Sequence, residues 1–492
     1  MRLALVIAMT TASALASADT PDYALTIYSS ATPGQIDSRR LADYGEHLPG
    51  YALVRDQRGM TLTKGRAELR FTDVAARMDP TTVGFASLTD PDGTRVVEQN
   101  YQYDLVSGQK LLERFIGETI SVEQTRGERL ETIEGNLLSA QNGLTLQLAN
   151  GQIATLTSWS GIRFPSLPGG LMTRPTLLWL LDAERGGRHE VRVSYQASGL
   201  TWWADYNATL EEKGDDCRID LGAWVTVVNQ SGGSFPDARL KLVAGEVNRA
   251  PAAPMHAPAP GVMMARMADA NEGFQESGLF EYHLYTLGRR TDLPDSSTKQ
   301  IELFPAAVGV KCRKDLVFTA PVRRAYHSAP FTEQGYAATV EGDVSALLAF
   351  DNDKPNGLGI ALPAGRVRVN QLGADGSLEF IGEDVIGHTP RNEKISLKLG
   401  KSFDVVGERR QVSLRVDSTA KWMEETIEVE VRNRKESVAR VIVRENLYRW
   451  SQWTIKDASH RHQPRDAATI DFPVDIPADG VAKVRYTARY TW

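Results

Sequence analysis

The sequence predicts a mainly β, multi-domain protein in which immunoglobulin-like β-sandwich domains accompany a small SH3-like barrel. Apolar residues recur at every second position far more often than at helical spacing, as in Glu190–Tyr195 and Ile427–Arg432. Turn signals such as Asp90–Gly93 and Asn150-Gly151 separate these runs. Short alternating runs with frequent turns are typical of sandwiches and barrels rather than α/β sheets. The 492 residues are enough for about three domains of roughly 150 residues each.

The first 18 residues are interpreted as a signal peptide. Arg2 precedes a short apolar stretch, and Ala16-Ser17-Ala18 then offers the small residues that a signal peptidase requires. The stretch is short and interrupted by Thr and Ser, which disfavours a membrane-spanning helix. An uncleaved anchor is the alternative. We therefore expect an exported protein, either periplasmic or secreted.

Two cysteines, Cys217 and Cys312, make up the whole cysteine content of the chain. Each lies in a segment with the pattern of a strand, and neither belongs to a Cys-x-x-Cys motif. In an oxidising compartment such a pair more often forms a disulfide than two free thiols. The alternative is two buried free cysteines that pack as small hydrophobic side chains. We expect a structural disulfide.

The first half of the chain is predicted to hold two β-rich parts. Residues 19–105 form an N-terminal β-rich region with polar, turn-forming interruptions. Ser107 then has the position of an N-cap for a short helix, and four short strand patterns follow between 118 and 156. A short helix with four or five such strands predicts the SH3-like barrel, placed at 106–172. Its several acids and its lack of an aromatic platform indicate a structural module rather than an RNA-binding one.

The second half is predicted to hold two β-sandwiches, at 173–405 and 406–492. A segment rich in Pro, Ala and Met at 249–278 interrupts the first sandwich, and we expect it to be a mobile loop because proline cannot donate to a sheet ladder. The pattern around Val225–Asn229 has an echo at Ile427–Asn433. This echo suggests two sandwich units of similar build.

Several motifs in residues 175–492 resemble a bacterial family of exported proteins. They are Gly199–Tyr206, Trp224–Gly232, Asp237–Gly245, Leu362–Val369, Phe380–Glu383 and Trp450–Trp453. The family is a domain of unknown function that also occurs in the C-terminal part of mucoidy-inhibitor-type proteins. The chain lacks the long heptad-bearing segment of those relatives, so no role of that coiled coil carries over. The resemblance implies an exported β-sandwich protein without an established activity.

No set of residues in the sequence predicts a catalytic, cofactor-binding or metal site. The chain has 56 Lys and Arg against 62 Asp and Glu, with both signs interspersed, which gives no basic face for nucleic acid. Nucleophile elbows and phosphate-binding loops with the required context are absent from the sequence. His460 and His462 have a spacing that zinc could use, but no further Cys or His lies near in sequence, and a surface turn explains them better.

Tryptophans are the candidate ligand-binding residues. Trp202, Trp203, Trp450 and Trp453 lie in strands or at strand ends, where exposed rings could stack on sugar rings. Alternation sends Trp202 and Trp203 to opposite faces, so at least one of them is expected in the core. Core packing of all four is the alternative, because a buried aromatic ring removes a large apolar area from water.

The function predicted from these observations is a non-catalytic scaffold or binding protein of the cell envelope. Its partner would be an envelope polysaccharide or another envelope protein. One alternative is an envelope-polysaccharide hydrolase, which would need two carboxyl groups at a defined separation. A second alternative is an outer-membrane β-barrel, suggested by the alternating residues that end at Trp492.

Overall fold

The computed structural model describes residues 20–28, 34, 36–44, 47–102, 107–126, 129–166, 168, 175–213, 216–245, 247, 274–279, 281–322, 329–336 and 338–492. The predicted signal peptide lies outside these residues. The fold is mainly β, with 67% of residues in strands and 4% in helices. The strands form several separate sheets, and in the described part of the chain none of them closes on itself. Within the same residues, no helix is both long and apolar enough to span a bilayer.

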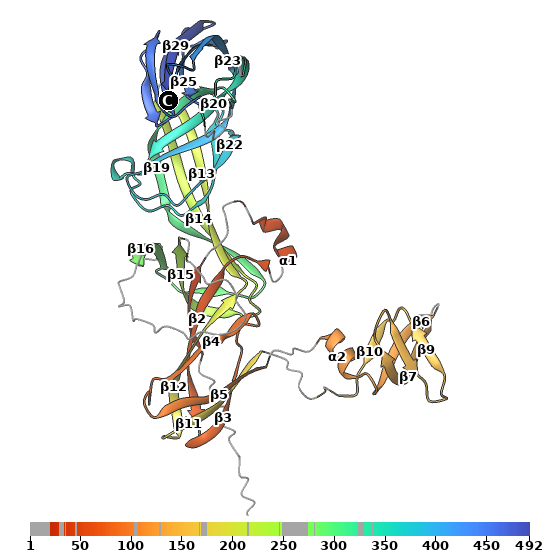
Figure 1. The fold of residues 1–492 in the computed structure, drawn as a ribbon. Helices are drawn as coiled ribbons and strands as arrows, with labels where there is room; N and C mark the ends of the chain where they lie inside the picture. Colours follow the sequence, from red (N-terminus) through yellow and green to blue (C-terminus); the bar gives the residue numbers. More distant parts are fainter. Residues whose placement is uncertain are drawn as a thin grey trace, which may run out of the picture.

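The first sheet combines strands from both ends of the N-terminal half (Figure 1). Its order is β16 (Phe274–Leu279), β17 (Tyr282–Leu287), β15 (Phe235–Ala244), β1 (Asp22–Tyr28), β2 (Tyr51–Leu62), β12 (Gly187–Ser198) and β4 (Met78–Ser87), with β18 (Thr291–Leu293) paired to β15. A three-stranded sheet lies beside it, in the order β3 (Gly65–Thr72), β11 (Thr176–Ala183) and β5 (Thr94–Gln102). Both sheets contribute to one core that includes Phe71, Trp179 and Tyr195.

The predicted region 19–105 therefore does not form a sheet of its own. β1 pairs in parallel with β15, which lies some 200 residues further along the chain, and β2 and β4 flank β12. The reason is edge pairing: β2 pairs with one edge of β1, and the other edge is paired only when β15, from beyond residue 173, joins the sheet.

Asp22 at the start of β1 is held by two arginines. Its carboxylate accepts a hydrogen bond from Arg290 at 2.8 Å and pairs with Arg239 of the neighbouring strand β15. Burial acts to raise the pKa of Asp22, but the hydrogen bonds and positive charges of Arg290 and Arg239 outweigh it, and the pKa is lowered.

Residues 107–163 form a small β unit with its own core. Ser107 caps α2 (Gly108–Arg114) by accepting a hydrogen bond from the Lys110 amide at 3.2 Å, as the sequence predicts. Five strands follow in one antiparallel sheet, in the order β10 (Gly161–Arg163), β6 (Thr119–Arg126), β7 (Arg129–Ser139), β8 (Leu144–Gln147) and β9 (Ile153–Leu156). The hydrogen-bonded order is open rather than barrel-like, because the two end strands have only three and four residues and each pairs with one neighbour.

The longest sheet builds the C-terminal half and contributes to two cores. Its order is β22 (Leu378–Ile386), β21 (Gly365–Leu372), β13 (Leu200–Lys213), β14 (Asp216–Asn229), β19 (Ser297–Thr319), β20 (Thr339–Asp351), β23 (Lys394–Asp417), β24 (Trp422–Asn433), β29 (Val481–Thr491) and β26 (Trp453–Ala458). β25 (Ala439–Asn446) pairs with β19 and with β28 (Thr469–Ile476), and β27 (Gln463–Asp466) pairs with β28.

Two strands of this sheet run through both cores. β19 has 23 residues and buries Ile301 and Val310 in the first core but Leu316 and Phe318 in the second. β23 has 24 residues and behaves in the same way. The boundary predicted at 405/406 lies inside β23, because the strand continues through this point with a register shift against β20 rather than a turn.

Cys217 and Cys312 form the predicted disulfide. Cys217 lies on β14 and Cys312 on β19, with their Cα atoms 5.1 Å apart. The neighbouring residues Arg218 and Lys311 are partners in the antiparallel ladder. The disulfide therefore joins two adjacent strands of the long sheet.

The predicted loop at 249–278 ends earlier than expected. Residues 249–273 lie outside the described part of the chain, but Phe274–Leu279 forms β16 and pairs with β17. The strand carries few apolar residues, so its pattern resembled a loop. Backbone pairing with β17 makes this segment a strand.

The predicted echo between the two sandwich units has a structural counterpart in two buried asparagines. The Asn229 side chain donates to the carbonyls of Gly233, Leu293 and Pro294 at 2.8–3.0 Å. The Asn433 side chain donates in the same pattern, to the carbonyls of Ser437, Ile476 and Pro477 at 2.8–3.1 Å. In both cases one acceptor lies four residues ahead, and the other two are a proline and the residue before it. Both asparagines end a long strand. The two units therefore share a local anchoring scheme as well as a sequence pattern.

The second core contains a network of buried charges. Arg409 donates to Glu445 at 2.9 Å, and Arg449 pairs with Glu425 at 2.8 Å, with all four side chains no more than 2% exposed. The Tyr486 hydroxyl donates to Glu445 at 2.6 Å. Such pairs are costly to break, because removing one partner leaves a buried charge uncompensated.

Candidate ligand-binding site

A polar cavity of about 870 Å³ lies on the outer face of the long sheet, against the segment that precedes β2. This volume is within the range of small-molecule sites. The cavity is lined by residues of the 34–39 segment, β13, β14, the start of β19, and β21: Gly34, Ile36, Asp37, Arg39, Trp203, Ala204, Asp205, Asn207, Trp224, Thr226, Thr298, Gln300, Arg366 and Arg368.

Strand alternation and register gather these side chains on one face. Residues 202, 204, 206, 208 and 210 of β13 are buried, so Trp203, Asp205 and Asn207 point outward. Asp205 lies beside Arg366 of β21 and opposite Trp224 of β14. A row of cation, carboxylate and aromatic ring therefore crosses three adjacent strands.

The two tryptophans of the cavity have different surroundings. Trp203 donates its indole N–H to Asp205 Oδ2 at 2.7 Å and packs against a small apolar cluster that contains Ile36 and Val228. The side chain of Trp224 is 41% exposed. Trp203 is thus a fixed wall of the cavity, whereas Trp224 offers an aromatic surface to a ligand.

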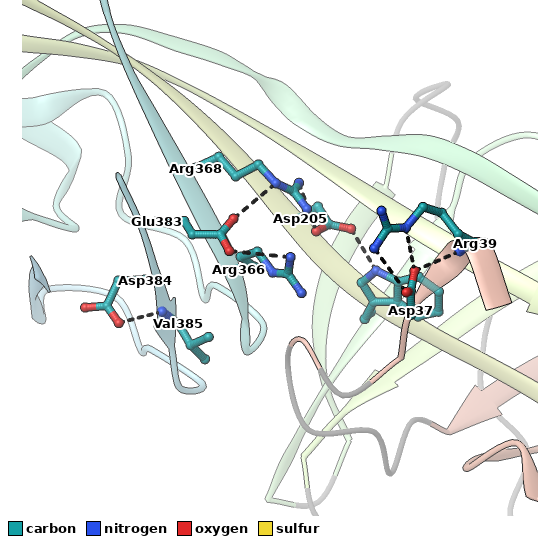
Figure 2. Close-up of polar contacts among 9 residues, drawn as sticks. Asp37, Arg39, Asp205, Arg366, Arg368, Glu383, Asp384 and Val385 are labelled. Atoms are coloured by element: carbon teal, nitrogen blue, oxygen red, sulfur yellow. Dashed lines mark hydrogen bonds and ion pairs between the residues drawn. The ribbon is translucent and has the colours of Figure 1, made fainter. Parts of the chain in front are cut away.

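Two arginines of β21 reach carboxylates on both sides (Figure 2). Arg368 lies 3.4 Å from Asp205 Oδ1 and 3.5 Å from Glu383 Oε2, and Arg366 lies 3.7 Å from Glu383 Oε1. Charge-assisted hydrogen bonds of this kind are usually 2.7–2.9 Å long. The contacts are therefore loose, and both guanidinium groups remain partly exposed.

Asp37 and Arg39 form the rim contributed by the N-terminal segment. Asp37 Oδ1 accepts hydrogen bonds from the Arg39 backbone amide at 3.0 Å and from its Nε at 3.1 Å, which caps the short 3₁₀ helix Ser38–Arg40 (Figure 2). These hydrogen bonds lower the pKa of the Asp37 carboxyl. Asp37 is therefore an anion at neutral pH.

Gly222 leaves a gap beside the exposed ring of Trp224. It lies opposite Asn207 in the ladder and two residues before Trp224, hence on the same face. A Cβ at this position would meet nothing within 4 Å. Glycine in the interior of a strand weakens the strand and often marks a place where a ligand approaches closely.

Of the four tryptophans predicted as ligand-stacking residues, only Trp203 lines this cavity. Trp202 is 2% exposed and packs near Tyr285 in the first core, so no ligand can stack on it. Trp450 and Trp453 pack partly buried against the second core, and the Trp453 indole donates to the Ala467 carbonyl at 2.8 Å.

Trp224, Asp205, Arg366 and Arg368 line the cavity but are not predicted as ligand-binding residues from the sequence. A usable signal was present: Gly222 and Trp224 share one face of a strand whose other face is apolar, and Arg366 and Arg368 alternate with valines. The sequence does not show that β14 and β21 both pair with β13, and these pairings bring the residues together.

His460 and His462 have local partners. The His460 ring lies 2.8 Å from the Ser459 hydroxyl, and the His462 ring packs on Phe472. Across the described residues, no group of three or more His, Cys, Asp or Glu side chains could hold a metal ion.

No family model matches the chain, and no curated protein matches its sequence.

Proposed function

We propose that this chain is an exported protein of the cell envelope that binds a carbohydrate in the cavity on β13, β14 and β21 without chemically altering it. The observation that carries this proposal is the exposed Trp224 ring, set beside the polar side chains of Asp205 and Asn207 and the open position at Gly222. A sugar ring presents an apolar face to an aromatic side chain, and its hydroxyl groups need donors and acceptors around it.

The polar lining suits hydroxyl groups in particular. Asn207 and Gln300 each supply both donors and acceptors, and Thr298 adds a hydroxyl group. Hydroxyl groups removed from water must be hydrogen-bonded to avoid a large cost. A lining that both donates and accepts meets that need for a polyhydroxylated ligand.

Binding is favoured over hydrolysis by the state of the carboxylates. Asp37 and Asp205 both line the cavity, but each accepts hydrogen bonds, from Arg39 and from Trp203 respectively. A glycosidase needs one carboxyl with a raised pKa to protonate the leaving group. The pKa of Asp37 is lowered instead.

Two further observations support an envelope location. The disulfide between Cys217 and Cys312 is typical of proteins that fold in an oxidising compartment. The resemblance of residues 175–492 to a family of exported proteins agrees with it. We therefore propose a periplasmic or secreted protein, although scaffolding of another envelope protein would share this location.

The test is titration of the purified protein with tetrasaccharides: a neutral glucan, an amino-sugar polymer and a uronic acid polymer. Calorimetry gives the affinity, and the variants are Trp224→Ala and Trp159→Ala. Trp159 is a matched control because it is 39% exposed but lies in the small β unit, outside the cavity lining. We expect Trp224→Ala to weaken binding about tenfold and Trp159→Ala to leave it unchanged. Absence of binding by all three sugars, or equal effects of the two variants, would refute the proposal.

A further inference from the structure

We propose that the carbohydrate carries a carboxylate and that Arg366 and Arg368 bind it. This inference rests on the proposed function and specifies the chemical class of the ligand. It follows from the positions of the two arginines, from the looseness of their present contacts and from the balance of charge in the cavity.

The two arginines form one receptor. They are two residues apart on β21, so both side chains leave the same face of the sheet. Figure 2 shows both of them reaching the carboxylate of Glu383, one at each oxygen. The space between them thus already accommodates one carboxylate.

The contacts to Glu383 are replaceable. At 3.5 and 3.7 Å they are longer than the 2.7–2.9 Å of an optimal arginine–carboxylate hydrogen bond. Glu383 lies on β22, the end strand of the sheet, and its side chain is exposed. It can turn toward solvent at little cost, and a ligand carboxylate entering from the cavity can then form shorter hydrogen bonds to the same guanidinium groups.

The charge balance of the lining also favours an anion. Three arginines face two aspartates. Asp37 neutralises Arg39 and Asp205 lies close to Arg368, which leaves Arg366 with Glu383 at 3.7 Å as its ion-pair partner. Glu383 lies outside the lining and supplies the third negative charge, so a ligand carboxylate in the cavity would take the place of Glu383 beside Arg366.

The spacing of the strands sets the minimum length of the ligand. Arg366 and Trp224 lie on the two sides of Asp205 in one row, with two strand spacings between them, or roughly 10 Å. A ligand of two or more sugar units spans this distance when one ring stacks on Trp224 and the carboxylate is carried by the next unit.

The test compares a galacturonate tetrasaccharide with its methyl ester, which has the same sugar rings and no charge. A tetrasaccharide of N-acetylglucosamine and N-acetylmuramic acid provides the other common source of a sugar carboxylate. Calorimetry on the full-length, disulfide-bonded protein measures each affinity. We expect at least one acid to bind about tenfold more tightly than its methyl ester, and added salt to reduce the difference.

Three variants separate the roles of the side chains. Arg366→Gln should lower the affinity for the acid to about that for the ester. Glu383→Gln should strengthen binding of the acid several-fold, because it removes the competing carboxylate. Arg440→Gln is the control: it removes an exposed arginine whose ion-pair partner is 3.9 Å away, outside the cavity.

The outcomes distinguish the two proposals. Equal binding of both acids and their esters, lost in Trp224→Ala, would overturn the carboxylate inference and support the carbohydrate proposal. Weaker binding of the acid by Glu383→Gln would also overturn the inference. No binding of any acid, ester or neutral sugar would overturn both.

Discussion

Removing the disulfide should lower the free energy of unfolding by several kcal/mol. The separation of the two cysteines along the chain gives the magnitude. Cys217 and Cys312 are 95 residues apart, so the cross-link closes a long loop in the denatured chain. In the chain-entropy model, a loop of this length corresponds to about 4.7 kcal/mol at 25 °C. Residual structure in the denatured state reduces this value, and we expect the double variant Cys217→Ala/Cys312→Ala to lose about 3–4 kcal/mol.

The assay is equilibrium unfolding in urea, followed by tryptophan fluorescence and by circular dichroism. The transition to compare is the one that reports the long sheet, since β14 and β19 both belong to it. Reductant provides the control: it should destabilise the wild-type protein by a similar amount and leave the double variant unchanged. A loss below about 1 kcal/mol would refute the reasoning, because the cross-link would then not restrict the denatured chain. Two free thiols in protein isolated from its native host would contradict the expected oxidising compartment.

Three further predictions concern the buried charges, the pH response and the glycine beside Trp224. Glu445→Gln should lower the free energy of unfolding in urea by about 3–5 kcal/mol because it removes a buried negative charge 2.9 Å from the Arg409 guanidinium, whereas Asp475→Asn, which breaks an exposed pair, should lower it by less than about 1 kcal/mol. The pKa of Asp22 is lowered below 3.8 in the folded state. The ionised carboxylate therefore stabilises the fold above pH 3.8, and this contribution is lost as the pH falls through the folded pKa. Asp22→Asn should thus reduce the fall in melting temperature at acid pH. Gly222→Leu should reduce carbohydrate affinity at least tenfold in calorimetry while stability changes by less than about 1 kcal/mol, because the new side chain fills open space.

Each of these predictions has an outcome that contradicts it. Equal costs for Glu445→Gln and Asp475→Asn would show that burial does not govern the strength of the ion pairs. An unchanged acid limb in Asp22→Asn would mean that its arginine partners do not stabilise the folded state. Gly400 offers the control for Gly222, since it also has open space at its Cβ position but lies on β23, which contributes no residue to the cavity lining. If Gly400→Leu weakens carbohydrate binding as much as Gly222→Leu, the gap beside Trp224 has no role.

The fold class followed from the sequence because alternation is a local property. The burial of β24 alternates at every residue from Trp422 to Asn433, as the pattern at Ile427–Arg432 predicts. Which strands pair is not local. Nothing near Asp22–Tyr28 in the sequence indicates that its parallel partner is Phe235–Ala244. This pairing joins the predicted regions 19–105 and 173–405 in one sheet.

The candidate site was predictable only in part, for the same reason. Alternation shows that Trp202 and Trp203 face opposite ways, but it does not say which of them faces the core. The row from Arg366 through Asp205 to Trp224 depends on two strand pairings. β13 pairs antiparallel with β14, which follows it directly, and in parallel with β21, which lies more than a hundred residues further along the chain. The stacking of tryptophans on sugar rings stays a prediction from the sequence, and the sequence does not identify most of the residues that form the cavity.

The strands shared by the two cores limit how the protein can be divided for expression. A fragment that stops at residue 405 would end midway along β23 and remove the partner of the first residues of β20, which pair with 406–410. The unpaired backbone groups of β20 would then form an exposed edge, a common starting point for aggregation. Soluble production of the cavity therefore requires the whole of β23 as well as the strands that line it, although β23 contributes no residue to the lining.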